Sequence, residues 1–170
     1  MAYRNKTYVA FDGDYDDGDM WAYRLMTAWV ENEHIDFNFY NAHDINSARD
    51  TSDVESIKAQ LRVRMANAKQ MILLVGENTK RLRKYIPWEI ELARKKDIPI
   101  IVANLNKKRG YDAELCPSAV GNVVYTIHVA FYAKIIKYAL DNFPDAYDKY
   151  KKEKVGPYFY QDSVYKELGL

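Results

Sequence analysis

Short apolar runs alternate along this chain with longer stretches in which apolar residues recur at helical spacing. Runs of strand length, most of them ended by glycine or polar residues, predict strands at 7–12, 36–42, 70–75, 98–105 and 123–129. Helical spacing predicts helices at 19–30, 52–68, 87–96 and 132–142. Strands that alternate with helices favour a parallel sheet with right-handed crossovers. The pattern therefore predicts an α/β, flavodoxin-like three-layer sandwich with a central parallel five-stranded sheet and helices on both faces.

The length of 170 residues suits one domain with a sizeable core. We expect this domain to span 1–155. The last segment, 156–170, is rich in tyrosine, and its side chains are too apolar to remain in water. We expect it to form a C-terminal tail packed on the domain or on another copy of the chain.

Charge and cysteine content narrow the range of partners. The 25 basic and 24 acidic residues give a net charge of +1, which provides no global field for nucleic acid or an anionic membrane. No apolar run approaches the roughly 20 residues that cross a bilayer. The single cysteine, Cys116, cannot form an internal disulfide, and no signal-peptide pattern is present. We expect a cytoplasmic protein that binds neither nucleic acid nor membrane.

Ligands of parallel α/β sheets bind beyond the carboxyl ends of the strands. In this sequence those positions are Phe11 to Asp16, Ala42 to Ser47, Gly76 to Glu89, and Asn104 to Asn106. The stretch from His43 to Ser52 shows no periodicity and reads as a long loop, which in a compact domain is often functional.

An acidic turn from Asp12 to Asp19 follows the first expected strand. It does not fit a calcium loop, because the sixth position lacks glycine and Tyr23 stands where a bidentate glutamate belongs. A magnesium phosphohydrolase with Asp12 as nucleophile and Asp14 as acid/base stays open, although no late acidic pair completes its metal site. The alternative is that these aspartates cap the turn and the next helix, as Asp19 is placed to do.

Glu89 is expected in the first turn of a helix that begins near Pro87, at the edge of the sheet where the carboxyl ends of the strands lie. There the helix dipole would keep its carboxylate ionised. Glu91 lies about 200° around the helix, so the two carboxylates cannot face one pocket. An ionised carboxylate beside a bound ribose could hold its hydroxyls and stabilise an oxocarbenium-like transition state. A favourable glutamate near a helix N-terminus, with no catalytic role, is the alternative.

The order and spacing of these motifs resemble the TIR-like domain family, and within it the TIR-like subunits of the Thoeris anti-phage system. The stretches that carry the resemblance are Phe11-Asp12-Gly13-Asp14, Ala42-His43-Asp44, Ile57-Lys58 with Leu61-Arg62, Gly76-Glu77-Asn78-Thr79, Trp88-Glu89-Ile90-Glu91, Pro99-Ile100-Ile101, Asn104-Leu105-Asn106, Cys116-Pro117, Ile127-His128 and Tyr138-Ala139-Leu140-Asp141-Asn142. An acidic turn stands where better-known TIR domains have a Ser/Arg-rich one.

The resemblance implies that Glu89 matches the catalytic glutamate acting on NAD, which is a substrate and not a bound cofactor. It also implies a cyclic ADP-ribose isomer as product, a partner effector reached through that diffusible nucleotide, and self-association on activation. The expected pocket is lined by Phe11, Asp12, Asp14, His43, Asp44 and Trp88, with no metal.

Two further interpretations of individual residues remain open in the sequence. His43 with Asp44 could orient a ribose or a water, or could only order the loop, whereas His128, in an apolar run, reads as a core histidine. Trp88 could border a nicotinamide pocket or serve as a packing anchor.

A TIR-like adaptor that assembles without chemistry is the alternative to the enzyme.

Overall fold

Five parallel strands form the centre of the molecule, which is seen here in a computed structural model that describes residues 6–14, 18–37, 53–121 and 124–170. The strands pair side by side in chain order, β1-β2-β3-β4-β5. Their bounds are β1 Thr7–Ala10, β2 Gln70–Val75, β3 Ile100–Asn104, β4 Thr126–Ala130 and β5 Pro157–Phe159. β1 to β4 are buried throughout, as expected of a parallel sheet covered on both faces.

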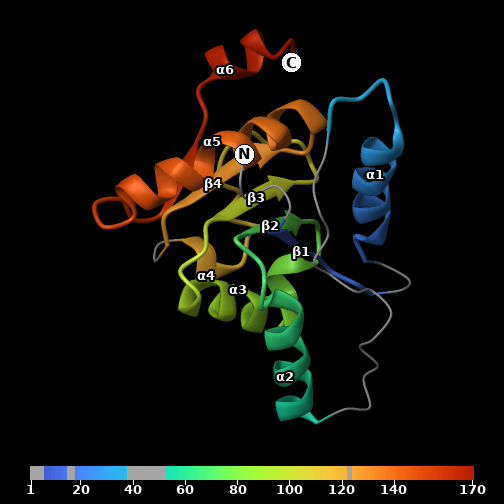
Figure 1. The fold of residues 1–170 in the computed structure, drawn as a ribbon, viewed down its shortest axis with the longest axis vertical. Helices are drawn as coiled ribbons and strands as arrows, with labels where there is room; N and C mark the ends of the chain where they lie inside the picture. The colour runs from blue at the N-terminus through green and yellow to red at the C-terminus, as the bar shows by residue number, and fades with distance from the viewer. Residues whose placement is uncertain (1–5, 15–17, 38–52, 122–123) are drawn as a thin grey trace.

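Helices cover both faces of the sheet (Figure 1). Their bounds are α1 Met20–Glu31, α2 Val54–Met65, α3 Tyr85–Lys95, α4 Ser118–Gly121, α5 Ala133–Tyr150 and α6 Asp162–Glu167, with a short 3-10 turn at Thr79–Arg81. α1 and α5 pack in one layer, and α2, α3 and α4 form the other. The predicted α/β, flavodoxin-like architecture with a five-stranded parallel sheet is confirmed.

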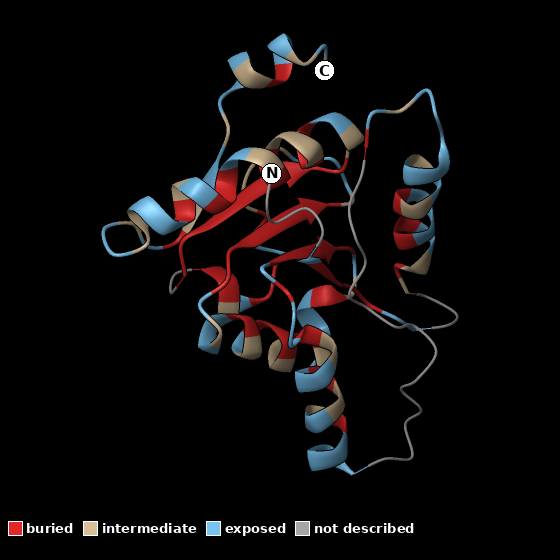
Figure 2. Ribbon diagram, in the orientation of Figure 1, coloured by how far each residue is buried: buried red, intermediate tan, exposed pale blue. Residues whose placement is uncertain are grey.

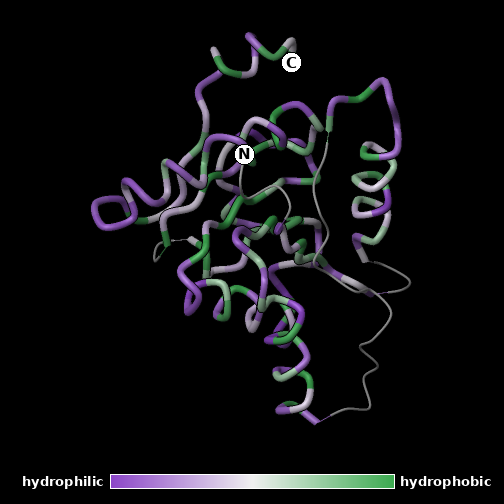
Figure 3. Tube along the Cα trace, in the orientation of Figure 1, coloured by the Kyte–Doolittle hydropathy of each residue, from purple (hydrophilic) through white to green (hydrophobic). Residues whose placement is uncertain are grey.

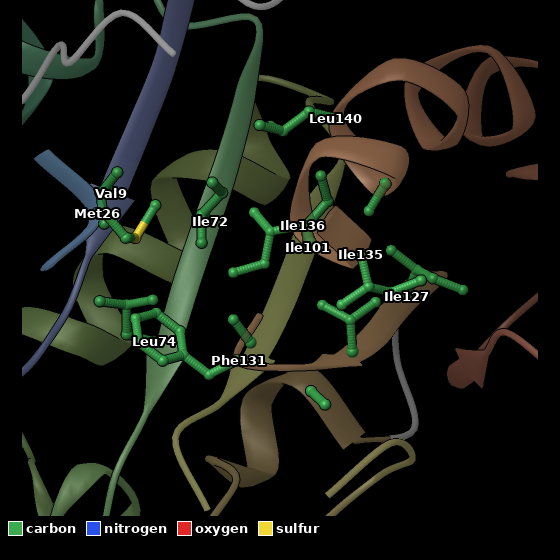
Figure 4. Packing of buried hydrophobic residues seen from close by; sticks show 14 of the residues in the cluster. Val9, Met26, Ile72, Leu74, Ile101, Ile127, Phe131, Ile135, Ile136 and Leu140 are labelled. Atoms are coloured by element: carbon green, nitrogen blue, oxygen red, sulfur yellow. The ribbon is translucent and has the colours of Figure 1, made fainter. Parts of the chain in front are cut away.

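Alternation along each strand divides the core into two layers. Val9 and Phe11 of the first strand and its exit face α1 and α5, whereas Tyr8 and Ala10 face α2 and α3. Figure 4 shows part of the first layer, where Ile101 and Ile136 meet between sheet and α5. Figure 2 shows the strands buried and the helices exposed on their outer sides, and Figure 3 shows mainly hydrophobic strands and helices in which hydrophilic and hydrophobic residues alternate. A residue's position in β1 therefore decides which helix layer it meets.

Several predicted element bounds differ from the structure. The third predicted helix begins at Tyr85, two residues before Pro87, which makes Glu89 the fifth helical residue and places it beyond the first turn. The last predicted helix extends past 142 to Tyr150 and contains Pro144. Of the expected strand 36–42, residues Asp36 and Phe37 are not in a strand, and 38–42 lie outside the described residues. The fifth strand of the sheet comes instead from the C-terminal tail.

This tail packs on the domain through β5 and α6. β5 pairs in parallel with β4, and Tyr165 of α6 is fully buried. The Tyr165 hydroxyl accepts the backbone N–H of Ala130 at 3.0 Å, and the Arg109 guanidinium lies 4.2 Å from the centre of the Tyr165 ring. These contacts anchor the chain end at the carboxyl edge of β4.

Within the parts of the chain that the structure describes, no helix combines the length and the apolar character needed to cross a membrane.

Replacing the buried anchor of the tail should destabilise the whole domain. We expect Tyr165→Ala to lower the free energy of unfolding by about 3–5 kcal/mol, because it leaves a cavity of aromatic size. Phe159→Ala, in the same tail but 61% exposed, should cost about 0.5 kcal/mol or less. Urea denaturation of both variants measures the difference, and equal losses would contradict the packing described.

Candidate active site

The Glu89 side chain points from α3 into the core and not into solvent. It is only 4% exposed, and the Tyr8 hydroxyl of β1 donates a hydrogen bond to its Oε1 at 2.5 Å. Glu91, by contrast, forms an exposed ion pair with Lys95 at 2.8 Å. The prediction that the two carboxylates face different surroundings is confirmed.

Burial changes the expected ionisation of Glu89. Loss of water around the carboxylate raises its pKa to about 7, while the Tyr8 hydrogen bond and the charge of Arg64 act in the opposite direction. The expectation that the helix dipole keeps the group ionised is wrong for this structure. The reason is that Glu89 lies beyond the first turn, where the dipole is weak, and burial outweighs it.

The second oxygen of Glu89, Oε2, has no hydrogen-bond partner among the described residues. A buried polar atom left without a partner costs about 1–3 kcal/mol. Stability alone therefore does not account for this carboxyl group, and such an atom is available to a ligand.

The acidic turn after β1 is held by its own backbone. Asp12 is buried; its Oδ1 accepts the N–H of Asp14 at 3.0 Å, and its carbonyl accepts the N–H of Asp19 at 2.7 Å. Asp14 is exposed. A Cβ at Gly18 would lie 2.3 Å from the carbonyl oxygen of Asp14, so only glycine fits where the turn folds back on itself. Asp12 thus serves as a turn-forming residue in this structure.

Asp19 lies at the N-cap position of α1, but its side chain makes no capping hydrogen bond. Its carboxylate instead reaches the end of β2, where Thr79 Oγ1 donates to Oδ2 at 3.5 Å and the backbone of Gly76 lies directly beneath. Burial, and then the charge of Asp12, raises the pKa of Asp19 to about 6. The interpretation of Asp19 as a helix cap is therefore corrected: it links the β1 exit to the β2 exit.

A hollow of about 260 Å³ lies at this edge of the sheet. The exits of β1, β2 and β3 meet there, as the topology predicts for a ligand site. Its walls are Gly18, Asp19, Trp21, Gly76, Glu77, Leu105, Asn106 and Leu115. Ligand pockets usually exceed about 300 Å³, so the hollow suits one part of a nucleotide and not the whole. The sequence predicted the Gly76 and Asn106 segments at this edge, whereas Trp21 was not among the expected pocket residues.

The structure does not bring all the proposed pocket residues together. Phe11 stacks on Tyr23 at 5.0 Å in the opposite core layer from Glu89. Trp88 lines a separate hollow of about 230 Å³ between α2 and α3, with Lys58 Nζ 5.2 Å from its ring centre. His43 and Asp44 lie outside the described residues. Glu89 lines neither hollow.

His128 is a core residue, as predicted. It is fully buried, its Nε2 lies 2.9 Å from Thr126 Oγ1, and burial lowers its pKa to about 4. It is neutral at physiological pH and takes no part in the edge hollow.

A family model described as "Thoeris protein ThsB, TIR-like domain" matches residues 8–110. The chain belongs to this ThsB TIR-like family. The matched part contains the acidic turn, the walls of the edge hollow up to Asn106, and α3 with Glu89. β4, α5 and the tail follow the part that the ThsB model matches. No curated protein matches the chain.

A methyl group at Gly76 should disturb the link between β1 and β2. A Cβ there would lie 2.3 Å from Asp19 Oδ1, so we expect Gly76→Ala to cost about 1–3 kcal/mol of folding free energy. Gly13→Ala is the control, because among the described residues no atom beyond its chain neighbours lies within 4 Å of its Cβ position. Thermal denaturation compares the two, and an unperturbed Gly76→Ala variant would contradict the close approach of Asp19.

The buried Glu89 carboxyl should make stability depend on pH. Its folded pKa, about 7, exceeds the ordinary value of 4.5, so its contribution is present below about pH 4.5 and is lost as pH rises through 7. Relative to wild type, Glu89→Gln should gain up to roughly 3 kcal/mol between these limits, at about 1.4 kcal/mol per pKa unit. Urea denaturation from pH 4.5 to 8 measures this. A constant difference across that range would contradict a raised pKa.

Proposed function

We propose that this chain cleaves NAD at the nicotinamide–ribose bond and closes the ADP-ribose on itself. The resulting cyclic ADP-ribose isomer would diffuse to a partner effector and switch it on during anti-phage defence. The observation that supports this most directly is the Glu89 carboxyl group, which lies in the family-matched region. Tyr8 holds one of its oxygens, and the other has no hydrogen-bond partner among the described residues.

Glu89 suits the chemistry of this cleavage. Breaking the bond leaves positive charge on the ribose ring, and a nearby carboxylate stabilises that charge. Nicotinamide leaves as a neutral molecule, so the reaction needs little acid assistance. The carboxylate must be ionised to act, and with a pKa near 7 the active fraction rises as pH passes through neutrality.

The edge hollow suits the nicotinamide end of the substrate. Asp19 and Glu77 line it, and their negative charge favours the cationic nicotinamide ring over the pyrophosphate. Trp21, also in its wall and 53% exposed, offers an aromatic face to the same ring. In this arrangement the phosphates would lie away from the acidic turn. The pocket would in this respect differ from that of better-known TIR domains, in which a Ser/Arg-rich turn stands at this position.

The enclosure of Glu89 supports the proposal that this structure is a resting state. A carboxylate that is 4% exposed cannot touch a ribose until the residues covering it move. We propose that a trigger, together with self-association, opens this site and joins Glu89 to the edge hollow. Exclusion of water from the joined site would then favour ring closure over hydrolysis.

A non-catalytic TIR-like adaptor is the second candidate. The observation that favours it is the absence of Glu89 from the walls of both hollows. The phosphohydrolase has less support, because Asp12 is occupied by the backbone of its own turn and, within the described ranges, no three acidic, His or Cys side chains group as a metal site.

The decisive experiment measures nucleotides by mass spectrometry in cells that express the chain, with and without phage challenge. The wild type should produce an ADP-ribose isomer after challenge, and Glu89→Gln should reduce it about 100-fold or more. Glu91→Gln is the matched control: it changes an exposed carboxylate on the same helix and should leave the product unchanged. Intact defence with no NAD-derived product would sink the enzyme and favour the adaptor.

A further inference from the structure

The hydrogen bond between Tyr8 and Glu89 joins two residues that are 81 positions apart in the sequence. Tyr8 is fully buried on β1, and its ring packs in the core layer that contains α2 and α3. The short distance of 2.5 Å is typical of a hydroxyl that donates to a charged or partly charged oxygen. The packing of β1 against α3 thus fixes the position of one carboxyl oxygen of Glu89.

The described buried residues that form the core cluster around Tyr8 are apolar. Ala10 on β1, Met65 on α2 and Ile86 with Ile90 on α3 belong to the same buried cluster. Among the described residues, the titratable or charged groups that act on Glu89 are Tyr8 of β1 and Arg64 of α2. Few described groups therefore act on the ionisation of the Glu89 carboxyl, and of these Tyr8 is in direct contact with it.

The Tyr8 hydroxyl keeps its proton and donates a hydrogen bond to Glu89 in this structure. Burial, and then the charge of Glu89, raises the pKa of Tyr8 far above its usual range, so the phenol keeps its proton at all accessible pH values. Oε1 of Glu89 is occupied by this donor, and Oε2 lacks a partner among the described residues. The two oxygens of one carboxyl group therefore have different roles.

We infer that Tyr8 is a positioning residue that acts through Glu89: its hydroxyl holds Oε1, stabilises the ionised carboxylate, and leaves Oε2 to accept a hydroxyl group of the substrate ribose. The inference rests on the proposed function for the identity of the substrate. The control of Glu89 by Tyr8 rests on the structure and is measurable without substrate.

The test compares Tyr8→Phe with Tyr147→Phe. Both substitutions remove a tyrosine hydroxyl that donates to a carboxylate, but Tyr147 donates to Asp97 at 3.0 Å in the opposite core layer. The Glu89 carboxyl is titrated by carbon NMR on protein labelled with ¹³C at glutamate side chains. Its signal is identified by its absence in Glu89→Gln.

In Tyr8→Phe the titration midpoint of Glu89 should rise by about one pH unit, which is a tenfold loss of ionised carboxylate at a given pH below the midpoint. The acidic limb of the pH profile for NAD cleavage should move with it, and kcat should fall while KM stays nearly constant. Tyr147→Phe should change neither. A midpoint equal to that of the wild type overturns the inference, and so does a shifted midpoint with an unchanged pH–rate profile.

Failure of the proposed function can be distinguished from failure of the inference about Tyr8. If the triggered wild type cleaves no NAD, the proposed function fails, and the titration alone decides whether Tyr8 controls Glu89. If Tyr8→Phe does not fold, the test instead uses the NMR resonance of the Tyr8 hydroxyl proton in the wild type. This buried proton should give a low-field resonance that titrates with Glu89 and moves in Glu89→Gln, and a resonance indifferent to both changes overturns the inference.

Discussion

Burial of the Glu89 carboxyl group against the central sheet determines the properties of the candidate site. Glu89 enters the layer between sheet and helices because α3 turns it toward β1, where the Tyr8 hydroxyl meets it. An unpaired carboxylate in such a layer would be costly, so the group keeps its proton to a higher pH and relies on one strong donor. The same burial that makes Glu89 chemically unusual also closes it from solvent.

The division of β1 between two core layers explains how nearby residues come to have unrelated surroundings. Tyr8 meets Glu89 in one layer, while Phe11 packs on Tyr23 in the other. The acidic turn that follows reaches neither layer and instead joins the β2 exit through Asp19 and Gly76. The candidate site therefore consists of two separate parts, an edge hollow and an enclosed carboxyl group, which the proposed opening would join.

Much of the fold could be predicted because buried parallel strands read as plain apolar runs, as 70–75 does. The strand at 157–159 could not be predicted in this way. Its three residues are partly exposed, and they form a strand because they pair with the open edge of β4. Glu89 could be singled out from the motif around it, but its ionisation depends on its burial and then on the hydrogen bond from Tyr8, 81 residues away, which no local pattern reveals. Asp19 follows the helix-cap rule in position, yet its side chain is directed by the close approach of Gly76.

The enclosure of Glu89 in the resting protein can be measured by labelling carboxyl groups with a water-soluble carbodiimide and an amine, followed by peptide mass spectrometry. Glu91, two residues away and 55% exposed, serves as the internal standard. We expect Glu91 to be modified rapidly in the folded resting protein while Glu89 stays unmodified until the site opens. Modification of both residues at similar rates in the resting state would contradict the enclosed carboxyl group and the account built on it.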